Sequence, residues 1–142
     1  MRKLNIIMKK KRKYWLFVTN EKNWKTIKKN NIFGFNEKSK KDLEKLNLKD
    51  VAIIYIKGKK IGGIFEIISL QYNKKIKFAE GEYPYIIELK RLKLPKESLE
   101  VTDKIIQNIS IFRGLSRWGT ILMGRATKQI NKEDYLFIKE LM

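Results

Sequence analysis

The amino-acid sequence predicts an α+β domain, in which a small closed or half-closed β-barrel of five to six mostly antiparallel strands is flanked by short α-helices. Two observations carry this prediction. Several strand-forming runs are apolar at nearly every position, and short segments that begin with helix-capping residues lie between and after them. A strand without polar alternation is buried on both faces. Rolling such strands into a barrel covers them and also removes exposed sheet edges.

The first elements follow one another closely. YWLFVT at 14–19 is a continuous run of strand-favouring residues, so we expect a strand that is buried on both sides. Asn20 comes next and is a good N-cap for a helix over 21–30. NIFGF at 31–35 is then expected to form a short strand or a turn.

The middle of the chain contains one more short helix and two longer strands. Ser39 and Asp42 have the spacing of a capping box for the helix SKKDLEKL. VAIIYI at 51–56 is another continuous strand, and Gly58 marks a hairpin turn into a third strand over 60–72. The paired glycines inside that third strand predict a bulge or a close approach of another part of the protein.

The remaining elements are less uniform. IKFAE at 76–80 is a weaker strand candidate, whereas YPYIIELKRLKL at 83–94 is a clear strand with a proline near its start, where proline is tolerated. The segment 103–112 fits a helix, and 113–130 reads as loop with a short strand. Asn131 then caps a final helix.

The charge of the chain is strongly one-sided. Lysine and arginine number 33 against 15 acidic residues, which gives a formal net charge of +18. Such an excess argues for a polyanionic partner, either nucleic acid or an anionic membrane surface. Lysine-rich chains are also common in thermophiles, but thermophilic surfaces normally balance lysine with glutamate. We therefore favour nucleic acid over a general compositional bias.

The residue types present restrict the chemistry that the protein can perform. The chain has no cysteine and no histidine, which excludes disulfides, Cys/His zinc sites and the usual catalytic triads. An enzyme would have to work with carboxylates, lysine, tyrosine or an oxygen-bound metal. We expect a protein that uses neither a cofactor nor a metal ion.

The chain reads as one domain with a charged extension. Residues 1–13 form a basic arm that contains KKKRK, and residues 14–142 form a single domain without internal repeats. No apolar run approaches the ~20 residues that span a membrane, and the start lacks the apolar core of a signal peptide. We expect a cytoplasmic monomer that does not bind membranes.

Four segments, in their order and spacing, resemble the EVE domain: YWLFVTNEKNWKTIKKNNIFGF, KSKKDLEKLNLKDVAIIYIKGKKIGGIFEI, EYPYIIELKRLK and FRGLSRWGTILMGRATKQINKEDY. The resemblance covers about residues 14–141. It implies a PUA-like β-barrel, similar to the YTH domains that read modified adenine in RNA. It also implies a non-catalytic module that holds a flipped-out modified base in a pocket beside the barrel.

The implied pocket is built from the segment after the first strand, the aromatic strand after the first helix, and a late loop. In YTH domains a tryptophan on that short strand belongs to an aromatic cage, and Phe33 stands at this position here. Trp24 or Trp118 would provide the opposite wall, and Gly34 would let the backbone approach the base closely. Trp24 has an alternative role as a core residue, because it lies one helical turn before Ile27.

Polar and basic residues complete the candidate site. Thr19 and Asn20, where a strand ends and a helix begins, supply a hydroxyl, an amide and free helix N–H groups. Arg117, in the loop FRGLSRWG, can fork onto phosphate or stack on a base. The residues expected to hold phosphates are Arg113, Arg125 and Lys38.

The leading hypothesis is therefore a module that reads a modified base in RNA or DNA and holds the phosphate backbone with its basic surface. Two alternatives stay open. Glu80 and Glu82 could face together in an enzyme that modifies nucleic acid or a nucleoside. The chain could also be a basic adaptor without a base pocket, and its binding to an acidic partner would then depend on salt alone.

Overall fold

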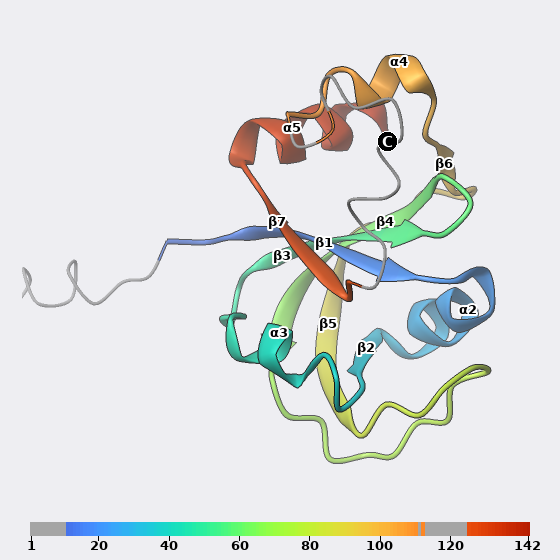
Figure 1. Cartoon of the computed structure of the whole chain (residues 1–142), viewed down its shortest axis with the longest axis vertical. Helices are drawn as coiled ribbons and strands as arrows, with labels where there is room; N and C mark the ends of the chain where they lie inside the picture. Colours follow the sequence, from blue (N-terminus) through green and yellow to red (C-terminus); the bar gives the residue numbers. More distant parts are fainter. Residues whose placement is uncertain (1–10, 111, 113–124) are drawn as a thin grey trace, which may run out of the picture.

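The computed structural model describes residues 11–110, 112 and 125–142. Its mixed sheet curls into a half-barrel, and short helices pack against it (Figure 1). The strands are β1 (Tyr14–Thr19), β2 (Ile32–Phe35), β3 (Val51–Ile56), β4 (Lys60–Ser69), β5 (Tyr85–Lys93), β6 (Leu99–Glu100) and β7 (Thr127–Ile130). The helices are α2 (Glu21–Asn30), α3 (Lys40–Glu44), α4 (Asp103–Ile106) and α5 (Lys132–Leu141).

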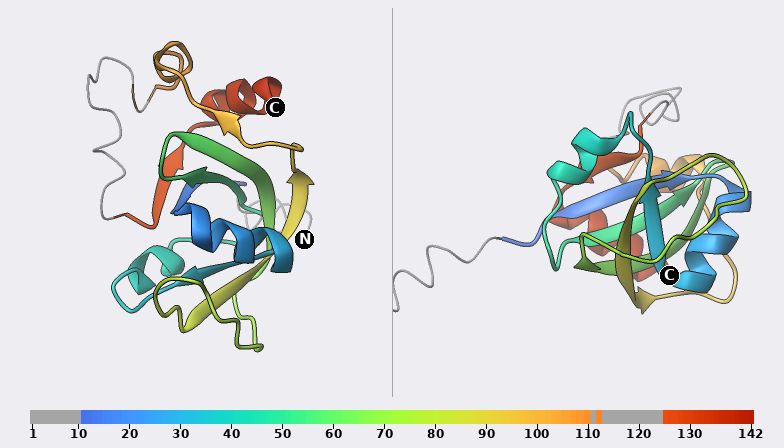
Figure 2. Two further views of the ribbon diagram at one scale, coloured as in Figure 1. Left: turned by 90° about the vertical axis from the view of Figure 1, so that its right-hand side faces the viewer. Right: turned by 90° about the horizontal axis from the view of Figure 1, so that it is seen from below.

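The order of the strands leaves one seam of the barrel open. The order is β2-β5-β4-β3-β1-β7, and β6 pairs with β4 beside this path. β1 is parallel to β3, and every other recorded pair is antiparallel. This confirms the predicted fold of mostly antiparallel strands with flanking helices. β2 and β7 stand at the two ends of the order and do not pair with each other, so the described sheet is not closed (Figure 2).

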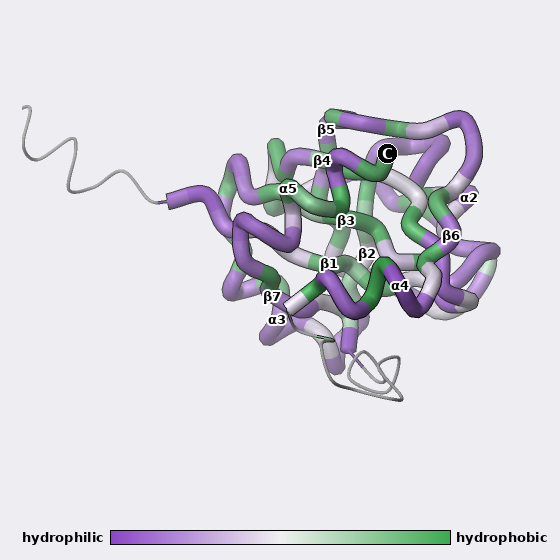
Figure 3. The backbone as a smooth tube through the Cα atoms, turned by 90° about the horizontal axis from the view of Figure 1, so that it is seen from above, coloured by the Kyte–Doolittle hydropathy of each residue, from purple (hydrophilic) through white to green (hydrophobic). Residues whose placement is uncertain are grey.

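The continuously apolar strands are covered on both faces, as predicted. Trp15 and Phe17 of β1 point to a core shared with α2, whereas Leu16 and Val18 point to a core shared with α4 and α5. Successive side chains of a strand point to opposite faces, so both faces of β1 need apolar residues. Figure 3 shows hydrophobic stretches gathered in the strands and hydrophilic stretches in the connections around them.

The glycine pair in β4 forms the predicted bulge and also admits the indole of Trp24. The register of β4 against β3 shifts by one residue at Gly62. A Cβ atom on Gly62 would lie 2.6 Å from the indole of Trp24, so only glycine leaves room there. Trp24 is 3% exposed and packs edge-on against Phe65, with 6.2 Å between the ring centroids.

The 76–80 segment is not a strand, contrary to expectation. It belongs to the long irregular connection between β4 and β5, and side-chain contacts hold it in place of strand pairing. Phe78 is buried with the core, and the amide of Asn23 bonds to both backbone polar groups of Glu80, at 2.9 and 3.0 Å.

Local polar contacts explain the other differences from the expected elements. α4 ends at Ile106, because the chain turns so that the Ser110 N–H donates to the Asp134 carboxylate at 2.9 Å. Ser39 makes no capping bond to α3, because its hydroxyl accepts the Asn36 N–H at 3.0 Å instead. The short strand β6 was not predicted, since two residues are too few to show a pattern.

Candidate nucleic-acid binding site

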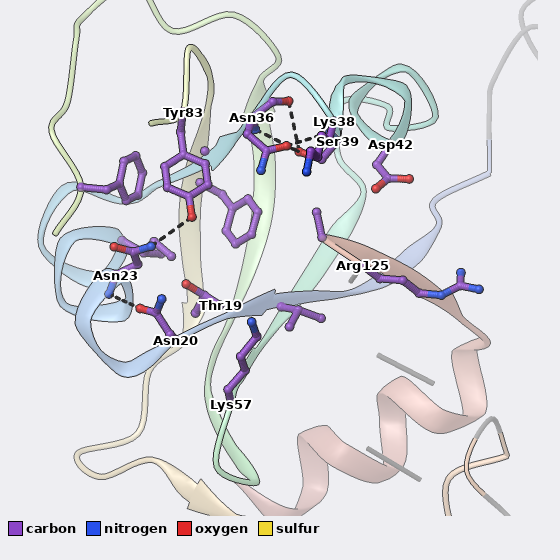
Figure 4. Close-up of a pocket in the computed structure, with 16 residues that line it drawn as sticks. Thr19, Asn20, Asn23, Asn36, Lys38, Ser39, Asp42, Lys57, Tyr83 and Arg125 are labelled. Atoms are coloured by element: carbon purple, nitrogen blue, oxygen red, sulfur yellow. Dashed lines mark hydrogen bonds between the residues drawn. The ribbon is translucent and has the colours of Figure 1, made fainter. Parts of the chain in front are cut away.

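A pocket of about 320 Å³ lies at the open seam of the half-barrel (Figure 4). Both ends of the sheet contribute to it, through Phe33 and Gly34 of β2 and through Arg125 and Ala126 just before β7. The end of β1, the start of α2, the turn after β2 and the β4–β5 connection supply the other walls. The pocket therefore occupies the place where strand pairing stops.

Two asparagines, the N-cap Asn20 and Asn23 in the first turn of α2, join the helix start to the β4–β5 connection. Asn20 caps the helix by accepting the Asn23 N–H at 2.8 Å, and its amide donates to the Glu80 carboxylate at 2.9 Å. Asn23 is 2% exposed and also donates to the Tyr83 hydroxyl at 3.2 Å. Lys22 pairs with the same Glu80 carboxylate at 3.2 Å. Glu80 therefore has a structural role in holding this wall of the pocket.

Aromatic side chains form the apolar part of the lining. Phe33 is 3% exposed and packs on Phe17, with 4.7 Å between the ring centroids. Phe78 and Tyr83 also line the pocket and meet edge to face, with 4.7 Å between the ring centroids. They lie directly over Gly34, where a Cβ atom would come within 2.6 Å of Tyr83 and 2.9 Å of the Phe78 ring.

The backbone of Gly34 presents polar groups to the open seam. In an antiparallel pair, residues alternate between those whose N–H and C=O groups bond the neighbouring strand and those whose groups point away. The Leu89 N–H donates to the Asn31 carbonyl at 2.8 Å, so Phe33 and Phe35 bond to β5 and Gly34 points away. Among the described residues β2 pairs only with β5, and no backbone bond to Gly34 is recorded outside the strand pairs, so its N–H and C=O groups have no recorded partner there.

Charged side chains stand around the pocket on separate segments. Lys38, Lys57 and Arg125 line it, and none of them forms an ion pair within the described residues. In Figure 4 Lys57 points toward the middle of the pocket, whereas Arg125 extends away from it at the edge. Asp42 is the acidic residue among the lining side chains, and its carboxylate lies 4.0 Å from Lys45.

The structure brings together most of the described residues that the sequence suggested for the site. Those that line the pocket are Thr19, Asn20, Phe33, Gly34, Lys38 and Arg125. Trp24 does not line it, because its indole lies in the core against Gly62. Arg113, Arg117 and Trp118 lie outside the described residues.

Several lining residues escaped the sequence analysis. Asn23, Phe78 and Tyr83 come together from segments about 60 positions apart, as the 60-residue separation of the Asn23–Tyr83 bond illustrates. A buried asparagine inside a helix carries no local signal that distinguishes it from an exposed one. Phe78 was assigned to a strand, which hid its role in an irregular wall.

Two features bear on membranes and metals. Within residues 11–110, 112 and 125–142, no helix has the length and apolar character required to cross a bilayer. The same part of the chain contains no group of three or more acidic side chains that could hold a metal ion.

Similar proteins were found both by sequence and by fold. A UPF0310 protein of Pyrococcus abyssi is 28% identical over 91% of this chain and 99% of its own length. A UPF0310 protein of Pyrococcus horikoshii is 27% identical over 91% of this chain and 98% of its own length. The YTH domain of the Zygosaccharomyces rouxii MRB1 protein, solved in complex with N6-methyladenosine RNA, shares the fold with a TM-score of 0.68. It is 12% identical, and the match covers 94% of this chain and 85% of that one.

The sequence model of the EVE domain matches residues 13–141, which is nearly the whole chain. The half-barrel and the fold shared with YTH domains agree with this match. The protein therefore belongs to the EVE domain family.

Proposed function

We propose that this protein is a non-catalytic nucleic-acid-binding module whose seam pocket holds one modified base of RNA or DNA. The observation that carries the proposal is the composition of the pocket: aromatic faces, asparagine amides, an unpaired strand edge and separate cations surround one cavity. The shared fold with a YTH domain solved on N6-methyladenosine RNA supports it.

The aromatic walls would hold the plane of the base. Phe33, Phe78 and Tyr83 are the aromatic side chains that line the pocket. Stacking on an aromatic side chain is worth about 1–3 kcal/mol per base, and flipping a base out of its stack costs a few kcal/mol. Stacking alone therefore about balances the cost of flipping, so hydrogen bonds and phosphate contacts must supply the net affinity.

The base edge would be read by groups of both hydrogen-bonding types. The N–H and C=O groups of Gly34 provide a donor and an acceptor side by side. Thr19 and Asn20 add a hydroxyl and an amide from the other side of the seam. An ionised carboxylate such as that of Asp42 accepts hydrogen bonds but donates none, which favours a base with an amino group over one without.

Cations would hold the phosphates on either side of the flipped base. Lys38 and Arg125, which the sequence suggested as phosphate contacts, line the pocket together with Lys57. The proposal also includes Arg113, Arg117 and Trp118 of the segment FRGLSRWG as further contacts. Such contacts are largely independent of sequence and weaken with salt.

The test is a titration with short single-stranded RNA and DNA that carry one modified base or none, at two salt concentrations. The modified bases are methylated cytosine, hydroxymethylated cytosine and methylated adenine. Phe33→Leu removes the ring from the pocket, and Phe35→Leu is the matched control, because Phe35 is fully buried on the same strand and does not line the pocket. We expect one modification to tighten binding, and only Phe33→Leu to remove that gain.

Two results would overturn the proposal. One is equal binding of all oligonucleotides with equal loss in salt, which would indicate a basic surface without a base pocket. The other is a modification preference that survives Phe33→Leu as well as it survives Phe35→Leu, because the base would then bind elsewhere.

A further inference from the structure

A second and broader depression, of about 1270 Å³, lies directly beside the pocket under the β4–β5 connection. Both cavities share the lining residues Asn36, Lys38, Phe78 and Tyr83, so they form one continuous surface. We propose that this depression, which we call the lysine groove, holds the single-stranded nucleotides adjacent to the base in the pocket. The inference rests on the proposed function and adds where the strand runs.

The charge of the lysine groove matches a phosphate backbone. Lys74, Lys75 and Lys77 line it together with Lys38, and the segment 71–79 contains no acidic residue. These four lysines are exposed and form no ion pair within the described residues. A backbone placed along them would gain contacts without first breaking any recorded salt bridge.

Acidic side chains in the lysine groove are few and partly engaged. Glu37 and Glu82 also line it. The Glu37 carboxylate accepts the hydroxyl of Tyr85 at 3.1 Å. Lysines therefore dominate the field along the 71–79 side, and a strand would lie there with its phosphates away from Glu82.

The exposed lysines of α2 provide a contrast to those of the lysine groove. Lys22 is paired with Glu80, and the ammonium of Lys28 lies 5.8 Å from the centroid of the Trp24 ring. Lys25 and Lys29 are exposed but line neither cavity. The two sets of lysines thus carry similar charge on different surfaces, and only one set is continuous with the pocket.

The floor of the lysine groove suits unpaired nucleotides rather than a duplex. Tyr72, Phe78 and Tyr83 supply aromatic surface, and Ile76 and Ile86 supply aliphatic surface. Proteins that bind single strands combine a basic groove with aromatic side chains on which exposed bases stack. The bases of a duplex are already stacked on each other and offer no free faces, so a single strand gains more from this floor.

The experiment compares two double variants that remove the same charge. Lys74→Ala/Lys75→Ala changes the lysine groove, and Lys25→Ala/Lys29→Ala is the control on α2. The probes are fluorescein-labelled single strands of about ten nucleotides, with and without the base modification that binds best, and the unmodified sequence as a duplex. Anisotropy titrations at several salt concentrations give the slope of log affinity against log salt.

The groove variant should bind both single strands more weakly and lower the magnitude of their salt slope by about 1.4, since each phosphate contact on a single strand contributes ~0.7. The α2 control should change that slope by less than half as much. Equal changes in the two double variants would overturn the inference, because the lysines would then act only as a diffuse field. If the groove variant lost as much affinity for the duplex as for the single strands, the inference that the lysine groove holds a single strand would be overturned.

The outcome also separates this inference from the proposed function. The groove variant could lose affinity for unmodified and modified strands alike while the wild type shows no preference for a modified base. That result would support the lysine groove and count against base reading. A preference for a modified base that responds equally to both double variants would support base reading and overturn the groove.

Discussion

Two polar clusters at the starts of helices use similar residue types, but one is enclosed in the protein and the other lines a cavity. At the start of α5, the Asp134 carboxylate accepts the backbone N–H and the hydroxyl of Ser110, at 2.9 and 2.7 Å, and Asn131 completes the cluster. Asp134 is 3% exposed. At the seam, Asn20 likewise caps a helix, but it lines a cavity beside Gly34.

The difference follows from how the sheet is covered. Where α4 and α5 lie over the sheet, polar groups are enclosed and must satisfy one another, because an unpaired buried group costs about 1–3 kcal/mol. Where β2 and β7 leave the barrel open, a strand edge and several side chains face a cavity that a ligand can enter. The covered side should therefore determine stability, and the seam should determine binding.

The largest expected effect on stability lies on the covered side. Ile138 of α5 is fully buried in the core between the helices and the sheet. Ile138→Ala should lower the free energy of unfolding by about 2–5 kcal/mol, as measured by urea denaturation. Its affinity for a single-stranded oligonucleotide should be unchanged under conditions where the variant is folded. A matching loss of affinity would show that the two regions are not separable.

Gly34→Ala should damage the pocket more than the fold. The new Cβ atom would lie 2.6 Å from Tyr83 and 2.9 Å from Phe78, so the β4–β5 wall must move. Overpacking of this kind costs about 1–3 kcal/mol, and the preference for a modified base should disappear. Gly63→Ala is the control, because its Cβ atom would meet Leu94 at 3.0 Å, away from the pocket. Equal binding by both variants would contradict the assignment of Gly34 to the site.

Asn23→Ala should loosen the wall while leaving the helix in place. The substitution removes the amide that bonds the backbone of Glu80 and the hydroxyl of Tyr83, at a cost of about 1–3 kcal/mol. Hydrogen exchange should accelerate across 78–83 and remain slow in the strands. Asn30→Ala, which removes only a bond to Thr26 within the same helix, should leave exchange in 78–83 unchanged. If the two variants behave alike, Asn23 does not hold this wall.

The smallest effect should come from the exposed ion pair that joins the same wall to α2. Lys22 and Glu80 have side-chain exposures of 71% and 50%, and exposed pairs contribute at most about 1 kcal/mol. Lys22→Ala should therefore reduce stability by less than Asn23→Ala does. The difference between wild type and Lys22→Ala should shrink at high salt in the same urea experiments. A larger loss than that of Asn23→Ala would reverse the ranking of these contacts.

Elements whose cause is local could be predicted from the sequence. The strand at 14–19, the Asn20 cap and the helix over 21–30 depend on neighbouring residues, and they occur as expected. The bulge at Gly62 was also predictable, because glycine weakens a strand interior and often marks a bulge or a close approach of another group. Ser39 stands at the N-cap of α3 as predicted, but the side-chain bond of a capping box does not form, since the Ser39 hydroxyl accepts the Asn36 N–H instead.

Features that depend on contacts between residues far apart in the sequence could not be predicted in the same way. Trp24 and Phe33 are both aromatic residues that the sequence suggested for the pocket, yet only Phe33 lines it. The distinction arises from Gly62, which makes room for the indole of Trp24 some 38 positions along the sequence. The far wall at Phe78 likewise depends on an asparagine in α2, and no periodicity in either segment records that contact.

The most direct test of the central claim is to map where a modified base binds, by ¹H–¹⁵N NMR of the protein titrated with a short modified oligonucleotide. The unmodified strand serves as the reference, so that phosphate contacts cancel. The account predicts that the differences cluster at 19–23, 33–36 and 78–83, around the seam pocket. Differences centred on α4 and α5, or spread evenly over the basic surface, would contradict it.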